Sequence, residues 1–539
     1  MTAWRPGRAA LLAAVVLLAT APSPSTVIAA NHYPARYSSF HDYPGMVADI
    51  HAVQAAHPDI VRTFSIGRTY LGRTIWAVEV SDHVGVDEGE PEVLLDALHH
   101  AREHLTPEMA LYALHLLADR YGDADTIGQR VTRLVDTRRI WIIPMVNPDG
   151  LQYDLGGGPF AGGAFKGWRK NRQPVTGSSA VGTDLNRNYG YGWQPGTSAQ
   201  ASMYPGPHAW SAPEARAVRD FVLSRRVGGV QRIRTHITFH TSGELVMWPY
   251  SRDPTNIPSD MTVLDHSTLV AMGGAMAATN GYTAKQSGDE GRKPGSEIDW
   301  LYGSQRIFAF TIELYPRGHQ SMRDFYPPER LIGRETARNR DALLYLIDLA
   351  DCPYRAIGKG ASLCGPLFDD METGRGWTVD PSGTDSATAG TWQRSDPAAS
   401  AWQLGRAASG RDVLVTGASR GDDVDGGSTT IRSRFVRLPT GRVATLHLRY
   451  WTGMSSGSGP EDRFTVQVVG RDPGTTPLPA LTVTGDGRAH RPAWHSLRVE
   501  LPAGLAGKDV AVLLAAVDAG HASVVEAGVD DVRSTVADP

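Results

Sequence analysis

The stretch Leu98-His99-His100-Ala101-Arg102-Glu103-His104 stands where a strand gives way to a helix. The apolar run Glu92 to Leu98 before it has the length of a buried strand. Thr106-Pro107-Glu108 after it carries the residues of a helix start, with Thr106 as the cap. Sites of α/β folds lie at such strand ends. The spacing His100-x-x-Glu103 supplies one imidazole and one carboxylate, which suit Zn²⁺, although this pair alone is a weak signal.

Strands and helices alternate along the first two thirds of the chain, which predicts an α/β domain whose helices flank a mostly parallel or mixed sheet. The predicted helices are Tyr43–His57, Thr106–Tyr121, Ser211–Arg226 with a capping box, Asp260–Asn280 and Glu329–Ala350. The predicted strands are Val61–Ile66, Arg73–Ser81, Glu92–Leu98, Ile140–Val146, His236–His240 and Arg306–Leu314.

From Pro366 onward the composition changes, because lysine nearly disappears and helical periodicity is lost. Short strands separated by Gly, Asp, Pro and Ser predict an all-β sandwich of jelly-roll type. The predicted division is therefore a signal peptide at 1–30, an α/β domain at 31–351, a linker at 352–365 and a sandwich at 366–539.

Charge and cysteine content narrow the class of protein. A net charge of −4 with mixed charges shows no nucleic-acid footprint. Arg5 and Arg8 precede the apolar run Ala9 to Thr20, which is too short to span a bilayer. Together with cleavage after Ala29 or Ala30, this pattern predicts a secretory signal and an extracellular protein that is not attached to the membrane after cleavage. We also expect the protein to be a monomer. The two cysteines, Cys352 and Cys364, are then expected to form a disulfide.

Several separate motifs carry further chemistry. His240 ends the short strand HITFH, and Glu313 lies almost at the end of the apolar strand RIFAFTIEL. An acid is costly to bury there unless it has a task. Two polar clusters, W-R-K-N-R at 168–172 and D-L-N-R-N at 184–188, lie between the predicted strands.

In this order, H-x-x-E, W-R-K-N-R, D-L-N-R-N, the strand-ending histidine and F-T-x-E-L resemble the secreted zinc carboxypeptidases of the carboxypeptidase A family, over roughly residues 37–350. The resemblance implies a carboxypeptidase-like fold with a mixed eight-stranded sheet. It also implies one zinc ion held by His100, Glu103 and His240 with water in the fourth position, which is a catalytic arrangement.

The resemblance assigns further roles residue by residue. Glu313 matches the general base, and Arg172 matches the arginine that stabilises the oxyanion. Asn186 and Arg187 match the pair that holds the terminal carboxylate of the substrate. Supporting positions are also implied: Asp184 orients the first zinc histidine, Arg102 is an accessory substrate arginine, and His99 and His104 are structural or surface residues.

The side-chain pocket is implied by Met247, Ser251, Ile298 and Thr311. Ile298 stands where relatives specific for basic residues often carry Asp, so apolar or aromatic C-terminal residues are the expected substrates. Acidic residues are the alternative, because the loop 285–299 carries Arg292 and Lys293. The family's carboxylate-clamping tyrosine is missing from this loop, and Gly291 holds its place. Catalysis is expected to survive without that tyrosine.

The resemblance predicts the first of three functions, and the other two are alternatives. The first is a carboxypeptidase acting on the C-termini of peptides and proteins, without a large folded propeptide. The second keeps the fold but acts on cell-wall peptides with D-amino or γ-linked residues. The third is an inert peptidase domain that carries a binding module. For the sandwich we expect a glycan, surface or protein ligand, with Ca²⁺ near Asp369-Asp370 and Asp530-Asp531 as a further hypothesis.

Overall fold

The structure is a computed structural model that describes residues 1–2, 39–87, 90–159, 161–196, 198–227, 230–372, 374–408, 410–441, 443–519 and 523–537. The predicted signal sequence beyond its first two residues, including both cleavage positions, lies outside the described residues. Among the described residues, no helix combines the length and the hydropathy needed to span a bilayer.

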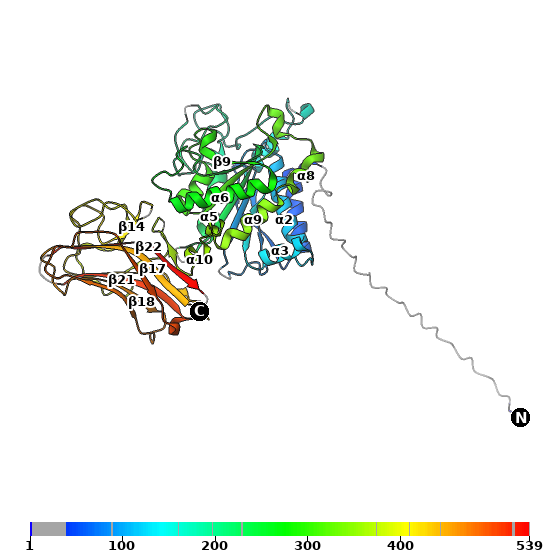
Figure 1. The fold of residues 1–539 in the computed structure, drawn as a ribbon. Helices are drawn as coiled ribbons and strands as arrows, with labels where there is room; N and C mark the ends of the chain where they lie inside the picture. Colours follow the sequence, from blue (N-terminus) through cyan, green and yellow to red (C-terminus); the bar gives the residue numbers. More distant parts are fainter. Residues whose placement is uncertain are drawn as a thin grey trace.

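A mixed sheet of eight strands forms the centre of the first domain (Figure 1). Its middle four strands, β4, β3, β7 and β10, run parallel to one another, and the strands at both sides include antiparallel pairs. The order across the sheet is β1 (Val61–Arg68), β2 (Thr74–Val80), β4 (Arg139–Ile143), β3 (Glu92–Ala97), β7 (Ile233–Gly243), β10 (Phe308–Arg317), β8 (Leu245–Trp248) and β9 (Thr283–Gln286).

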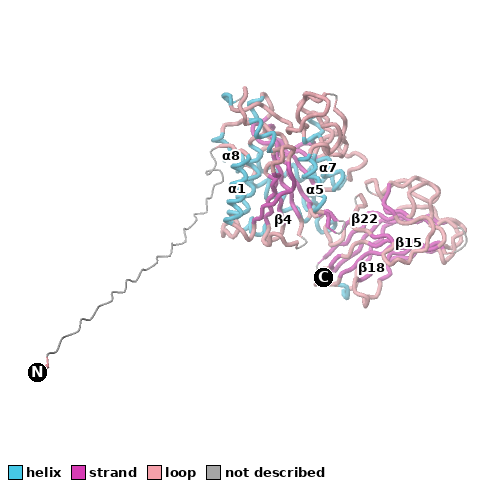
Figure 2. The backbone as a smooth tube through the Cα atoms, turned by 180° about the vertical axis from the view of Figure 1, so that it is seen from behind, coloured by secondary structure: helices cyan, strands magenta, loops and turns pink. Residues whose placement is uncertain are grey.

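Helices cover both faces of this sheet, as the α/β prediction required (Figures 1 and 2). On β3, Val93 and Leu95 enter the core of one face and Leu94 enters the core of the other, as the twofold alternation of a strand demands. The first face packs against α1 (Tyr43–Ala56), α2 (Leu105–Asp119), α3 (Thr126–Val135), α6 (Val263–Asn280) and α9 (Arg340–Asp348). The second face packs against α5 (Pro213–Ser224) and α7 (Glu297–Gln305).

Two helix predictions were wrong in detail. No side chain caps α5, and Glu214 of the predicted capping box instead accepts hydrogen bonds from Tyr70 N and Asn171 Nδ2. The single helix predicted over Glu329–Ala350 is divided into α8 (Ile332–Ala337) and α9. Asn339 lies at the break, where its amide donates to Glu335 O and accepts from Asn280, so side-chain bonding competes with the helical pattern there.

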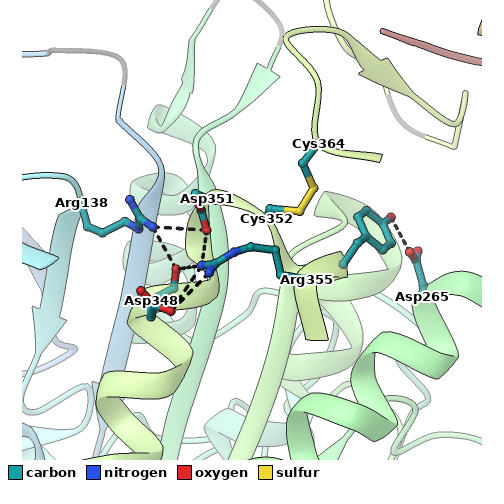
Figure 3. Close-up of a disulfide and its surroundings, with 8 residues drawn as sticks. Arg138, Asp265, Asp348, Asp351, Cys352, Arg355 and Cys364 are labelled. Atoms are coloured by element: carbon teal, nitrogen blue, oxygen red, sulfur yellow. Dashed lines mark hydrogen bonds and ion pairs between the residues drawn. A yellow bond between two sulfur atoms is a disulfide. The ribbon is translucent and has the colours of Figure 1, made fainter. Parts of the chain in front are cut away.

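The segment after α9 is fastened at several points (Figure 3). Cys352 and Cys364 form a disulfide with their Cα atoms 5.7 Å apart. Arg138 donates to the carbonyl of Asp348 and lies 3.2 Å from an oxygen of Asp351. Tyr354 Oη of the linker donates a hydrogen bond of 2.7 Å to Asp265 Oδ1, which holds the linker against the α/β domain from which it emerges.

The C-terminal region consists of two antiparallel sheets that share one hydrophobic core, which agrees with the all-β prediction (Figure 2). One sheet contains β11 (Phe368–Asp369), β13 (Gln393–Ser395), β14 (Val413–Val415), β17 (Val443–Met454), β20 (His495–Glu500) and β22 (Val525–Ala537). The other contains β12 (Thr378–Val379), β15 (Gly427–Arg432), β16 (Val436–Arg437), β18 (Arg463–Gly470), β19 (Leu478–Thr484) and β21 (Asp509–Asp518).

The Ca²⁺ hypothesis gains no support from the acidic pairs of this region. Asp369 accepts hydrogen bonds from Met371 N and Trp377 Nε1, and Asp370 lies 3.5 Å from Arg375 Nη2. Among the described residues, groups of three or more metal-ligating side chains occur only in the α/β domain. The charges of Asp369 and Asp370 are therefore balanced by hydrogen bonds and by an arginine.

The two domains meet through a buried ion pair. Arg306, directly after α7, lies 2.9 Å from Glu372 of the C-terminal region, and their side chains are only 6% and 3% exposed. Glu372 also accepts hydrogen bonds from the backbone N–H groups of Arg411 and Asp412. The same carboxylate thus joins the α/β domain to a loop of the sandwich.

Replacing Glu372 by alanine should lower the free energy of unfolding by about 3 kcal/mol, because it leaves the buried Arg306 without its carboxylate. Chemical denaturation measures this change. The matched control is Asp341→Ala, whose partner Arg340 lies 3.0 Å away in a pair that is 40% and 43% exposed. That loss should cost less than about 1 kcal/mol. Equal costs for the two variants would contradict the importance of the interdomain pair.

Candidate metal centre and substrate cavity

Three side chains converge at the carboxyl ends of β3 and β7. His100 and Glu103 follow β3, and His240 lies near the end of β7; all three side chains are at most 5% exposed. His100 Nδ1 lies 2.7 Å from Glu103 Oε1, and His240 Nδ1 lies 2.9 Å from Glu103 Oε2 and 3.1 Å from His100 Nδ1. Ligands of a tetrahedral zinc ion at their usual bond lengths stand roughly 3.3 Å apart. The donor set and its spacing therefore fit zinc.

The turn that carries His100 and Glu103 is held by Thr106. Its hydroxyl accepts a hydrogen bond from Leu98 N at 3.1 Å and donates to Glu103 O at 2.8 Å. Helix α2 begins at Leu105, so Thr106 is not the helix cap that the sequence predicted. Its side chain instead ties the end of the strand to the start of the helix, on both sides of the ligand pair.

Asp184 lies behind the first histidine. Its Oδ1 is 3.1 Å from His100 Nε2, which leaves His100 Nδ1 directed toward the other ligands. Its Oδ2 accepts a hydrogen bond of 2.9 Å from Arg169 Nε. Burial raises the pKa of Asp184, but Arg169, His100 and Arg187 outweigh it and hold the pKa well below its usual value. The carboxylate stays charged and orients both His100 and Arg169.

Glu313 joins the cluster through the register of two parallel strands. It is paired with His240 across β10 and β7, and it borders the same cavity as the three ligands. Burial, followed by the charge of Glu103, raises the pKa of Glu313 to about 8. A carboxylate with a raised pKa is a stronger base than an exposed glutamate.

The cavity in front of the cluster has a volume of about 250 Å³. Of the predicted residues, it is bordered by His100, Glu103, His240, Glu313, Asn186, Arg187, Arg102, Met247, Ser251, Ile298 and Thr311. Arg169, Ser287 and Lys293 border it as well, and the sequence analysis assigned no site role to Arg169 or Ser287.

The oxyanion role predicted for Arg172 does not agree with its position. Its guanidinium stacks 3.5 Å from the ring centroid of Tyr153 and 4.7 Å from that of Trp168, and it does not border the cavity. Arg169 does, with its Nη1 3.9 Å from Glu103 Oε1. The motif W-R-K-N-R offers two arginines of the same chemistry, so no sequence signal distinguished them.

Two further histidines, His99 and His104, are buried near the metal centre. His99 is fully buried, with its ring centroid 5.7 Å from that of His240 and its Nε2 2.8 Å from Tyr189 Oη. Burial lowers the pKa of His99 to about 3, so the ring is neutral. His104 is also buried, 2.9 Å from Asp154. Neither is a surface residue, and the other alternative of the prediction, a structural role, fits both.

The loop that lacks the clamping tyrosine has its own backbone constraint. Gly291 has a φ of 92°, in the left-handed region that strains other residues. No heavy atom lies within 4 Å of a Cβ built at this position. The backbone itself, and not a lack of space, therefore disfavours a tyrosine at Gly291.

Comparisons with known proteins place these motifs in a family. Residues 46–342 match the family described as zinc carboxypeptidase. A zinc carboxypeptidase of Saccharothrix mutabilis subsp. capreolus is 40% identical over 332 residues, covering 61% of this chain and 73% of that protein. Carboxypeptidase B of Bos taurus is 28% identical over 288 residues, covering 52% of this chain and 64% of its own length, just under two thirds.

Two further comparisons bear on fold and activity. The crystal structure of thrombin-activatable fibrinolysis inhibitor matches with a TM-score of 0.51 and 24% identity, over 59% of this chain and 75% of that chain, which supports the fold alone. A Saccharomyces cerevisiae relative named an inactive metallocarboxypeptidase is 25% identical over 332 residues, covering 59% of this chain and 73% of that protein. Evidence for turnover must therefore come from the side chains of the site.

Substituting Asp184 by asparagine should weaken zinc binding by roughly 10- to 100-fold, because the amide cannot supply the negative charge that orients His100. Competition with a metal-sensitive dye measures the affinity. The matched control is Asp119→Asn, another carboxylate bound to a histidine, with its Oδ2 3.1 Å from His115 Nδ1 and away from the cavity. Unchanged zinc affinity in folded Asp184→Asn would contradict the orienting role.

Proposed function

The chain belongs to the zinc carboxypeptidase family, and on that premise we propose that it is a secreted enzyme that removes single residues from the C-termini of peptides and proteins. One observation carries the proposal: Glu313 is paired with His240 in the same cavity that Asn186 and Arg187 border. A base beside the metal centre and a fork for a free carboxylate are the two requirements of an exopeptidase. The disulfide between Cys352 and Cys364 is consistent with an oxidising compartment.

The proposed reaction divides the work among a few groups. His100, Glu103 and His240 would hold zinc, which supplies a Lewis acid that polarises a carbonyl and favours attack by water. Glu313 accepts the proton of the attacking water and delivers it to the leaving amine. Its pKa, which burial raises to about 8, allows it to hold that proton between the two steps.

Arginine side chains that border the same cavity fix the substrate. Arg187 presents a guanidinium that binds a carboxylate through two parallel hydrogen bonds, and Asn186 adds a short donor beside it. Arg169, held by Asp184, is placed to stabilise the negative charge that develops on the carbonyl oxygen. Arg102 stacks over the ring of Phe325 at 4.1 Å and borders the cavity as a further cation.

The direct test is digestion of N-terminally blocked peptides, with products identified by mass spectrometry. We expect stepwise loss of single C-terminal residues, inhibition by a zinc chelator and recovery with added zinc. An otherwise identical C-terminal amide should resist, because it lacks the carboxylate that Arg187 binds. Glu313→Gln should keep zinc and lose two to four orders of magnitude in kcat, the usual weight of a general base. Internal cleavage, activity confined to D-amino or γ-linked peptides, or no turnover with zinc bound would contradict the proposal.

Arg169→Lys should lower kcat/KM by roughly 10²- to 10³-fold, the usual weight of one oxyanion donor. Lysine keeps the charge but loses the Nε donor that Asp184 holds. Arg172→Lys is the matched control from the same motif, and its kcat/KM should change only a few-fold. Steady-state kinetics on one peptide measures both variants. A larger loss in Arg172→Lys would restore the original assignment of Arg172.

A further inference from the structure

One lysine reaches the part of the cavity that receives the substrate side chain. Lys293 borders it together with Met247, Ser251, Ser287, Ile298 and Thr311. Met247 and Ile298 are apolar and buried, and Ile298 was the reason to expect an apolar substrate residue. The remaining side of this wall is polar, and its cation is one of the two loop residues on which the acidic alternative was based.

Hydrogen bonds place Lys293 at the wall. Its backbone N–H donates to Ser251 O at 2.8 Å, and its Nζ donates to Ser287 O at 3.2 Å. The residue is half-buried, whereas its neighbour Arg292 is exposed. Lys293 is thus the loop cation that faces the cavity.

The ammonium group of Lys293 forms no short ion pair in the described part of the chain, although the carboxylate of Glu313, which borders the same cavity, acts on its charge. Among the described residues, Lys293 forms no ion pair within 4.0 Å, and its one side-chain hydrogen bond is to a carbonyl oxygen. The nearby loop acid Glu290 is instead paired with Lys285. Burial lowers the pKa of Lys293, as expected for a cation that has lost part of its hydration. An anionic ligand would replace the favourable interactions with water that the Lys293 ammonium group loses on burial.

Two hydroxyl groups complete a polar surface beside Lys293. Ser251 Oγ donates to Ser287 Oγ at 2.8 Å, and both residues border the cavity. Asp299, which could oppose an anion, does not border the cavity, because its oxygens accept hydrogen bonds from Ser251 N and Arg252 N. The wall therefore offers one cation and hydroxyl groups to a side-chain carboxylate, and apolar contacts to its methylene groups.

We propose that Lys293 makes this enzyme selective for peptides that end in an acidic residue, with glutamate preferred over neutral residues. The proposal rests on the proposed exopeptidase function and names its substrate class. It favours the acidic alternative over the expected apolar preference, because Lys293, and not the exposed Arg292, borders the pocket beside Ile298 and Met247. A charge-assisted hydrogen bond to Lys293 should favour Glu over the isosteric Gln by roughly 10- to 100-fold in kcat/KM.

The test uses peptides that differ only in a final Glu, Gln, Leu or Lys. Wild-type enzyme should release Glu fastest. Lys293→Met keeps the length of the side chain but removes its charge, so the Glu/Gln ratio should fall to about one while Leu release is retained. Lys293→Glu should favour Lys over Glu. Arg292→Met, the exposed neighbour, is the matched control and should leave the ratio unchanged.

Several outcomes would overturn the proposal. Faster release of Leu than Glu by the wild type, or an unchanged Glu/Gln ratio in Lys293→Met, shows that Lys293 does not select an acidic C-terminal residue. An equal loss for all four peptides in Lys293→Met shows that the lysine acts through Glu313, whose charge it faces.

Calorimetric binding of free L-glutamate and L-leucine separates this proposal from the exopeptidase function. Glutamate should bind wild-type protein more tightly than leucine, and Lys293→Met should abolish the difference. If binding follows this pattern but no peptide is cleaved, the exopeptidase function fails and the pocket proposal stands. If peptides are cleaved and glutamate has no advantage in binding or turnover, the pocket proposal alone fails.

Discussion

The parallel register of β7 and β10 is the constraint on which the rest of the site depends. It sets Glu313 beside His240, while β3 on the other side of β7 delivers His100 and Glu103 to the same edge. Parallel strands end at a common edge, so one arrangement of backbone hydrogen bonds brings a base and three ligands together. Burying these acids costs free energy, and interactions with histidines and arginines offset that cost.

Arg169 and Asp184 show how the charges of the cavity are balanced. Asp184 is fully buried and contacts His100 and Arg169, and Arg169 in turn lies near Glu103. One guanidinium thus neutralises charge at two carboxylates while it borders the cavity. Arg172, by contrast, stacks on the rings of Tyr153 and Trp168 and does not border the cavity.

Sequence reasoning succeeded where one residue type and one strand end define the chemistry. His100, His240 and Glu313 could be placed at strand ends because apolar runs mark the strands, and the mixed eight-stranded sheet followed by all-β sheets is confirmed. Sequence reasoning failed where the role of a residue depends on the direction of its side chain in the fold. Of two arginines three residues apart, Arg169 borders the cavity and Arg172 does not, and Lys293 borders it with its backbone bound to Ser251. The predicted 329–350 helix failed because side-chain bonding at Asn339 competes with the helix.

Helix α7 connects the substrate cavity to the other domain. Its first turn carries Ile298, which borders the cavity, and the residue after its last turn, Arg306, pairs with Glu372 of the sandwich. The two and a half turns of α7 connect Ile298 to Arg306 rigidly. The sandwich therefore contributes contacts to α7 that an unrelated module would not supply. Exchanging the sandwich for an unrelated module would remove the ion pair that holds the end of α7. Substrate selection would then change through Ile298, while the zinc ligands and Glu313 stay in place.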